Sequence, residues 1–164
     1  GLHNRRYLMP RLDEMLGRSN RRGERFALAI FDIDHFKKIN DSIGHLGGDY
    51  ILQRFADILV SQTRSMDVVA RFGGEEFIVV FSALEHGDVR QLVQRILEAV
   101  HEERFVFNDE DIPVTVSAGV AGIEEFVDQP ATPDALIAGA DDRLYLAKQA
   151  GRDCLVDVSG TLRI

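Results

Sequence analysis

The sequence predicts an α/β (α+β) domain in which helices cover a central mixed, mostly antiparallel sheet. Short apolar runs typical of strands alternate with longer stretches in which apolar residues recur at helical spacing. Two of the strand-like runs, residues 67–71 and 77–81, are joined by FGGEE, whose adjacent glycines favour a tight reversal. The resulting hairpin excludes a purely parallel, doubly wound sheet.

The first predicted elements are a helix and a buried strand. Leu8, Leu12, Met15 and Leu16 follow helical spacing and Asn4 is a suitable N-cap, but Pro10 predicts that the helix either kinks or begins there. Residues 26–33 (FALAIFDI) form a nearly continuous apolar run, which is typical of a strand covered on both faces.

Two helices and the hairpin are expected next. A short helix is predicted to start near Phe36, and a second one to open at Gly47, Gly48 and Asp49 and to carry apolar residues at helical spacing from Ile51. The hairpin of residues 67–71 and 77–81 then follows.

The last third of the chain predicts a helix, a strand, another helix and a final strand. The apolar stripe of residues 89–100 indicates an amphipathic helix, and residues 113–121 a strand. Thr132 and Pro133 are typical of a helix start, and Gly151 is typical of a stop after Gln149. Residues 154–158 are expected to close the sheet.

Composition narrows the function classes. The 164 residues are 45% apolar and contain no linker-like tract, which predicts a single domain over residues 1–164. The formal charge of −8 argues against binding to a nucleic-acid polymer or to an acidic membrane surface. One cysteine excludes an internal disulfide, and neither a signal peptide nor a membrane span is visible, so we expect a cytoplasmic domain.

The acids at two predicted strand ends are the first candidates for chemistry. Asp32 ends the buried strand, and Glu75 and Glu76 lie at the tip of the hairpin. If the strand ends converge, a cation between the carboxylates would relieve their repulsion, and magnesium prefers such oxygen ligands. The alternative is a solvated turn with Asp32 as a cap, although the two glycines before the acids also allow a ligand to approach the backbone.

Four motifs in order resemble the GGDEF domain of bacterial diguanylate cyclases. They are GLHNRR at the start, DIDHFKKINDSIGHLGGD at residues 32–49, ARFGGEEF at residues 70–77 and ADDRLYLAKQAGRD at residues 140–153. The resemblance covers essentially the whole chain. It implies a fold like the palm of nucleotide cyclases and polymerases, excised from a longer multidomain signalling protein that could be tethered to a membrane.

The resemblance also implies the reaction and its catalytic residues. Two GTP molecules would be joined across a homodimer into cyclic di-GMP with loss of two pyrophosphates, with Mg²⁺ as cofactor or Mn²⁺ in its place. Asp32 and Glu75 match the family's metal-binding carboxylates, and Ile33 supplies a backbone carbonyl. Glu76 matches a position that assists the second metal or the proton transfer.

Nucleotide-binding positions follow from the same motifs. Asn40 and Asp49 match the positions that recognise guanine, since a carboxylate accepts hydrogen bonds from guanine N–H groups that adenine lacks. The positions that match phosphate contacts are Phe36, Lys37, Lys148 and Arg152. Without the motif, Asn40 and Asp49 would be interpreted as helix-end residues, and Lys148 as a complement to the helix dipole.

A second site is implied by RSMD, five residues before GGEEF. Arg64 and Asp67 match the family's RxxD site for inhibitory product, and Arg95 matches an auxiliary arginine. The alternative is a helix end followed by a strand start.

Two other functions remain open from the sequence. One is a catalytically weak regulatory module that binds GTP or cyclic di-GMP and signals to a partner or to an upstream sensor domain. The other is a palm-type cyclase or nucleotidyltransferase that uses ATP, against which Asp49 argues.

Overall fold

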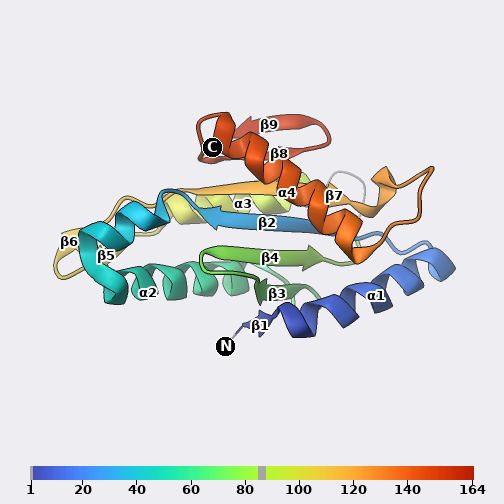
Figure 1. The fold of residues 1–164 in the computed structure, drawn as a ribbon, viewed down its shortest axis with the longest axis horizontal. Helices are drawn as coiled ribbons and strands as arrows, with labels where there is room; N and C mark the ends of the chain where they lie inside the picture. The colour runs from blue at the N-terminus through green and yellow to red at the C-terminus, as the bar shows by residue number, and fades with distance from the viewer. Residues whose placement is uncertain (1, 85–87) are drawn as a thin grey trace.

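A seven-stranded sheet lies between two layers of helices in the computed structural model, which describes residues 2–84 and 88–164 (Figure 1). The strand order is β1-β3-β4-β2-β7-β8-β9. The strands are β1 (His3–Asn4), β2 (Ala27–Ile33), β3 (Val68–Arg71), β4 (Glu76–Phe81), β7 (Val116–Gly122), β8 (Cys154–Asp157) and β9 (Gly160–Arg163). The helices are α1 (Arg5–Arg22), α2 (Phe36–Gln62), α3 (Asp88–Glu102) and α4 (Pro133–Gln149), with a short 3-10 turn at Ile123–Glu125.

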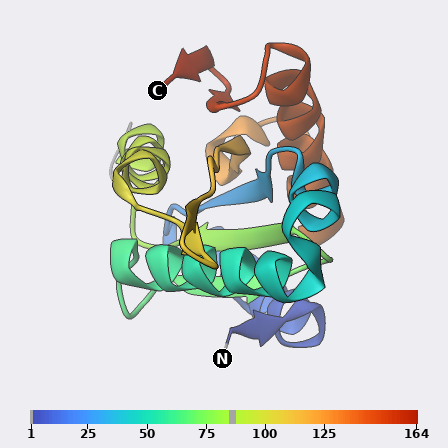
Figure 2. The ribbon, with the colours of Figure 1, turned by 90° about the vertical axis from the view of Figure 1, so that its left-hand side faces the viewer.

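The pairing confirms a mixed, mostly antiparallel sheet. Central β2 runs antiparallel to both β4 and β7, and β3 pairs with β4 in the predicted hairpin. Only β1 with β3 and β7 with β8 are parallel among the strands described. A separate two-stranded hairpin, β5 (Val106–Phe107) and β6 (Glu110–Asp111), lies beside α2 (Figure 2).

Alternation along the strands sends side chains into two cores. Phe31 of β2 and Phe77 of β4 pack under α2 and α3, whereas Ile30 and Ile78 pack under α1 and α4. Figure 2 shows α3 and α4 on opposite sides of the sheet. Because both faces are covered, the central strands are apolar throughout, which explains the continuous run at residues 26–33.

Helix α1 begins before Pro10, whereas one of the two alternatives predicted from the sequence had it begin at Pro10. Asn4 caps it by accepting a hydrogen bond from the Tyr7 backbone N–H at 3.1 Å, and the helix runs through Pro10 to Arg22. The prediction that the helix begins at Pro10 is therefore wrong. Proline removes one backbone hydrogen bond, and the buried Leu8 and Leu12 on either side hold the helix against the sheet.

Two predicted helices meet in α2. Gly44, at φ 77° and ψ 172°, breaks the helical geometry between them.

On the face of the sheet opposite α2, α4 crosses β7 so closely that a Cβ on Gly119 would lie 2.0 Å from the carbonyl oxygen of Ala140. No helix of the described residues is long and apolar enough to cross a membrane.

Candidate functional site

The strand register brings two of the predicted acids together. Asp32 of β2 and Glu76 of β4 are direct partners in the antiparallel ladder. By alternation with Ile30 and Ile78, both side chains belong to the face covered by α4. Asp32 is buried at 6% exposure, and Glu75 precedes Glu76 in the hairpin turn. We call Asp32, Glu75 and Glu76 the acid cluster.

The acid cluster carries more negative charge than its surroundings balance. Burial is the main cause that raises the pKa of Asp32, and the charges of Glu75 and Asp34 raise it further. Burial also raises the pKa of Glu76, followed by the charge of Asp32 and then that of Asp141.

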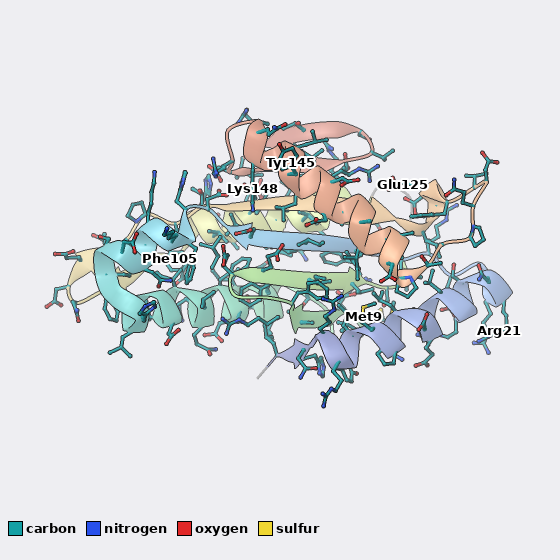
Figure 3. The ribbon with its side chains drawn as sticks, viewed as in Figure 1. Met9, Arg21, Phe105, Glu125, Tyr145 and Lys148 are labelled. Carbon is teal, nitrogen blue, oxygen red and sulfur yellow. The ribbon has the colours of Figure 1, made fainter. Side chains whose placement is uncertain are left out.

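One ammonium group lies against these acids. Lys148, near the end of α4, donates a hydrogen bond from Nζ to Asp32 Oδ2 at 2.6 Å (Figure 3). That contact lowers the pKa of Asp32 but does not outweigh burial. Lys148 therefore offsets only part of the charge of the acid cluster.

The donor chemistry of the acid cluster fits a hard divalent cation. No set of three or more His, Cys, Asp and Glu side chains in residues 2–84 and 88–164 is arranged to hold a metal ion by itself. Magnesium needs less than that, since it is commonly held by one or two carboxylates and keeps water and substrate phosphate as its other ligands. Two mutually repelling carboxylates at a strand end match this requirement.

Asp34 is a buried acid to which the sequence analysis gave no role. Its carboxylate accepts hydrogen bonds from Ser117 Oγ at 2.6 Å, Thr115 Oγ1 at 2.7 Å and the Asp153 backbone N–H at 3.0 Å. These donors join the end of β2 to β7 and to the turn after α4. Asp34 therefore positions the turn that contains Arg152.

That turn has an unusual backbone. Arg152 and Asp153 both adopt positive φ, at 65° and 51°, and Arg152 N donates to the Ala147 carbonyl at 3.0 Å. The side chain of His101, at the end of α3, contacts Asp153 Oδ1 at 2.6 Å. The two predicted phosphate contacts, Lys148 and Arg152, thus lie on one helix end and the turn that follows it.

The bend in α2 brings Asn40 beside the residue that precedes Asp49. A Cβ placed on Gly48 would lie 1.8 Å from Asn40 Oδ1 and 3.2 Å from Phe36 Cζ. A side chain at position 48 would therefore displace the Asn40 amide from this place. The structure therefore brings the two predicted guanine-binding residues to the same corner.

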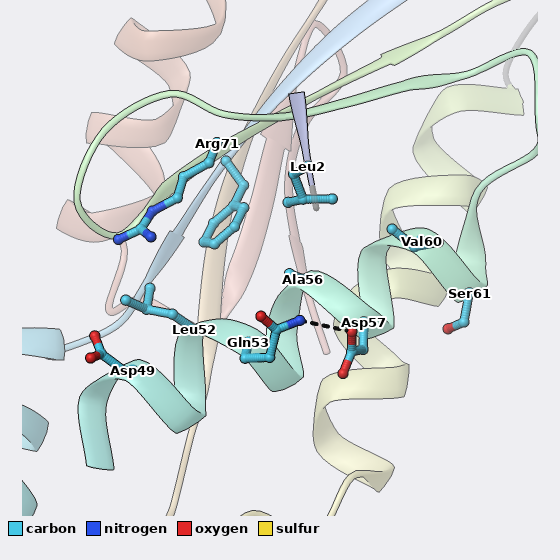
Figure 4. Close-up of a pocket in the computed structure, with 10 residues that line it drawn as sticks. Leu2, Asp49, Leu52, Gln53, Ala56, Asp57, Val60, Ser61 and Arg71 are labelled. Carbon is cyan, nitrogen blue, oxygen red and sulfur yellow. Dashed lines mark hydrogen bonds between the residues drawn. The ribbon is translucent and has the colours of Figure 1, made fainter. Parts of the chain in front are cut away.

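A pocket of about 880 Å³ opens between α2 and the strands on the face opposite the acid cluster (Figure 4). Asp49 and Arg71 line it together with apolar side chains that include Leu2, Leu52 and Phe77. The sequence analysis missed Leu2 and Leu52 as candidate ligand contacts. Two sequence features could have indicated them: Leu2 lies within the GLHNRR motif, and Leu52 is one helical turn after Asp49.

The first backbone N–H groups of α2 are not capped by the side chain that precedes the helix. His35 precedes the helix at φ 54° and provides no side-chain cap. Phe36 is buried and Lys37 exposed, so the ring anchors the first turn while the amine faces solvent. Free N–H groups of a first helical turn favour anionic ligands.

Arg64 and Asp67 pair with each other at the corner between α2 and β3. Asp67 accepts from the Arg64 backbone N–H at 2.8 Å and from its Nη2 at 3.2 Å, and Arg64 also donates to the Ser82 carbonyl. Both residues line a pocket of about 270 Å³. Arg95 of α3 donates to the Gln62 carbonyl at 3.2 Å, which brings it to the same end of α2. We call Arg64, Asp67 and Ser82 the RSMD corner.

Comparison with known proteins gives consistent matches. The family described as "Diguanylate cyclase, GGDEF domain" matches residues 1–154. Diguanylate cyclase DgcP of Pseudomonas aeruginosa is 43% identical over 155 residues, which are 94% of this chain and 22% of that protein. The response regulator PleD of Caulobacter vibrioides is 39% identical over 158 residues, which are 95% of this chain and 34% of PleD.

A solved structure agrees with the sequence matches. The GGDEF domain of DgcB from Caulobacter crescentus, in complex with c-di-GMP, superimposes with a TM-score of 0.88 at 29% identity. The match covers 97% of this chain and 92% of that one. The chain spans between about a fifth and a third of the length of the two curated relatives that it matches.

Proposed function

The chain belongs to the GGDEF domain family of diguanylate cyclases, and we propose that it condenses two GTP molecules into cyclic di-GMP with release of two pyrophosphates. The observation that supports the proposal most strongly is a pair of repelling carboxylates, buried Asp32 and half-buried Glu76, at the end of paired strands and next to the glycine turn that carries Glu75. Such an arrangement costs stability unless a cationic ligand uses it.

The guanine base would occupy the pocket on the α2 face. Its flat rings would lie against Leu2 and Leu52, while Asp49 accepts hydrogen bonds from the ring N–H and the exocyclic amine. Asn40, held against Gly48, supplies a donor and an acceptor in one plane. Adenine presents no matching pair of donors, so GTP is preferred over ATP.

The triphosphate would extend from the start of α2 toward the end of α4. The backbone N–H groups at Phe36 and Lys37 and the Lys37 ammonium would bind the β- and γ-phosphate oxygens. Lys148 and Arg152 would contact the same phosphates from the other side. Lys148 is paired with Asp32 in this structure and becomes available to phosphate when a cation neutralises that carboxylate.

Asp32, Glu75 and the Ile33 carbonyl would hold magnesium or manganese, with Glu76 at the edge of the site. The bound metal supplies charge neutralisation at the phosphate and lowers the pKa of the attacking hydroxyl. Glu76 accepts the proton of the ribose 3′-hydroxyl. The 3′-oxygen then forms a bond to the α-phosphorus, the bond from that phosphorus to the bridging oxygen breaks, and pyrophosphate leaves.

Two copies of the domain are required, because each one holds a single GTP whose 3′-hydroxyl must reach the α-phosphate of the other. A homodimer is therefore part of the proposal, and an upstream regulatory domain would control its formation.

The RSMD corner together with Arg95 would bind cyclic di-GMP as an inhibitor. We also propose a cytoplasmic location, because a single buried free cysteine suits a reducing compartment.

The test is product formation by the chain fused to a dimeric coiled coil, with GTP and Mg²⁺. Cyclic di-GMP and pyrophosphate in a ratio of one to two are expected, and ATP should give no cyclic product. Tight GTP binding without pyrophosphate release from the forced dimer would contradict the proposal and identify a regulatory binding module instead. A matched Glu75→Gln dimer is the control for contaminating activity.

A further inference from the structure

Arg71 ends β3, and its guanidinium is only partly used within the protein. Nε and Nη2 donate hydrogen bonds to the Gly74 carbonyl at 3.1 Å and 2.7 Å. The side chain forms no ion pair with any carboxylate of residues 2–84 and 88–164. An arginine has five N–H donors in a planar fork, so most of them remain available to a ligand.

The available side of this guanidinium belongs to the pocket that Asp49 lines. Both residues line the cavity of about 880 Å³, Arg71 from the sheet and Asp49 from α2. In Figure 4, Arg71 extends from its strand toward the end of the pocket where Asp49 and Leu52 lie. A fork of donors and a carboxylate acceptor thus share one end of a cavity with apolar walls.

Guanine matches this pair of groups on two edges. Its N1–H and N2 amine are donors, which a carboxylate accepts, whereas O6 and N7 are adjacent acceptors. An arginine guanidinium binds O6 and N7 together better than any other side chain does. Adenine has an amine in place of O6, which would oppose the guanidinium donors.

We propose that Arg71 is a specificity-determining residue that binds the O6 and N7 edge of the guanine whose other edge Asp49 binds. The inference rests on the proposed function, because it adds a contact within the same nucleotide pocket. It also gives the base a physical link to the acid cluster. The guanidinium that contacts the base also holds the Gly74 carbonyl, one residue before Glu75.

The competing explanation is that Arg71 only clamps the glycine turn. A clamp would stabilise the hairpin, and its loss would weaken the binding of every nucleotide alike. Contact with N7 has a different signature, because it distinguishes two ligands that differ in that single atom. The experiment therefore compares ligands within one protein sample, which removes differences in folding between variants.

The probes are 3′-deoxy-GTP, which lacks the attacking hydroxyl, and its 7-deaza analogue, which has carbon in place of N7. Calorimetry with Mg²⁺ measures the affinity of each for the wild-type chain, for Arg71→Met and for Arg22→Met. Arg22 is an exposed arginine at the far end of α1 and serves as the matched control. Wild type and Arg22→Met should bind the 7-deaza analogue about five- to tenfold more weakly, while Arg71→Met should bind the two equally.

Equal affinity of wild type for the two probes would overturn the role of Arg71 without any variant. A preference for N7 that persists in Arg71→Met would overturn it as well, because another donor would then contact the base. If 3′-deoxy-GTP failed to bind wild type at all, the proposed function itself would fail. Binding of both probes with equal affinity leaves the nucleotide pocket intact and rejects only the arginine contact.

Discussion

Two aspartates of this chain differ sharply in how their charge is satisfied. Asp67, in the RSMD corner, accepts hydrogen bonds from the Arg64 backbone, the Arg64 guanidinium and the Ser82 backbone N–H, and its side chain is 1% exposed. Asp32, in the acid cluster, is similarly buried but lies among other acids, and in residues 2–84 and 88–164 its carboxylate accepts a hydrogen bond from Lys148 alone.

The difference separates a carboxylate that stabilises the fold from one that we propose binds a cation. A buried charge with several donors stabilises the segments that supply them, whereas a buried charge among like charges is costly. Asp34, two residues along the chain from Asp32, shows the same contrast, because it accepts hydrogen bonds from three donors. The number of hydrogen-bond donors that the protein supplies is therefore our criterion for separating a structural acid from a proposed functional one.

The largest expected effect tests the acid cluster itself. Glu75→Gln keeps the shape of the side chain and removes a charge that the proposed cation site requires. Cyclic di-GMP synthesis by the forced dimer should therefore fall about a thousandfold, which corresponds to about 4 kcal/mol of barrier. The measurement is the initial rate of product formation beside a thermal melt.

Folding should not suffer from this substitution. Glu75 lies in a turn beside other acids, so the midpoint of the melt is expected to stay within about 2 °C of the wild-type value. Glu102→Gln, an exposed substitution on α3, is the matched control and should keep full activity. Near-normal turnover of Glu75→Gln would reject the metal assignment.

The second prediction concerns Asp34, which should behave as a structural acid. Asp34→Ala leaves Ser117 and Thr115 without their acceptor and frees the turn that carries Arg152, so the free energy of unfolding should fall by about 3 kcal/mol. Urea unfolding measures it. Asp41→Ala, at an exposed site in α2, should change stability by less than about 0.5 kcal/mol. An equal, small effect of both would remove the distinction between the two kinds of acid.

The third prediction tests nucleotide selection by Asp49. Asp49→Ser replaces the carboxylate with a hydroxyl and removes the proposed acceptor for two guanine donors. The ratio of GTP to ATP affinity should therefore fall about tenfold. Competition binding with both nucleotides measures the ratio. Asp57→Ser, which lines the same pocket two turns further along α2, is the matched control. An unchanged ratio would return Asp49 to the role of a helix-opening residue.

The sequence predicts the central strands and the helices because each has a continuous pattern. Residues 26–33 are apolar without interruption and residues 89–100 have a clear apolar stripe, so local pattern and final structure agree. The elements that were missed are β1, the β5–β6 hairpin and β9, which have two to four residues each. They are partly exposed and depend on pairing with distant segments, so no local periodicity indicates them.

For the candidate site, the motifs predict positions but not partners. The hydrogen bonds of Asp34 span 81, 83 and 119 residues, and no spacing rule reaches that far. The pairing of Lys148 with Asp32 spans 116 residues for the same reason. Leu2 and Arg71 acquire their positions beside Asp49 only when β1 and β3 are laid next to α2. These contacts follow from topology, which the pattern of single segments does not specify.

The smallest expected change in stability comes from the RSMD corner, where the two partners should separate. Arg64 is about 43% exposed, so Arg64→Ala should cost less than about 1 kcal/mol of unfolding free energy. Asp67→Ala should cost more, about 2 kcal/mol, because it also leaves the backbone N–H groups of Arg64 and Ser82 without an acceptor.

Feedback provides the functional half of this prediction. If cyclic di-GMP binds the RSMD corner, its guanine or phosphate must replace Asp67 as a partner of the Arg64 guanidinium, and that competition keeps the coupling modest, at about 1–3 kcal/mol. Arg64→Ala should therefore retain its initial rate and lose inhibition by added cyclic di-GMP, whereas Arg22→Ala should stay inhibited. Calorimetry with the catalytic pocket filled by 3′-deoxy-GTP should show product binding to wild type and none to Arg64→Ala. Inhibition that survives in Arg64→Ala would mean that the RSMD corner does not bind the inhibitor and that it serves only to join α2 to β3.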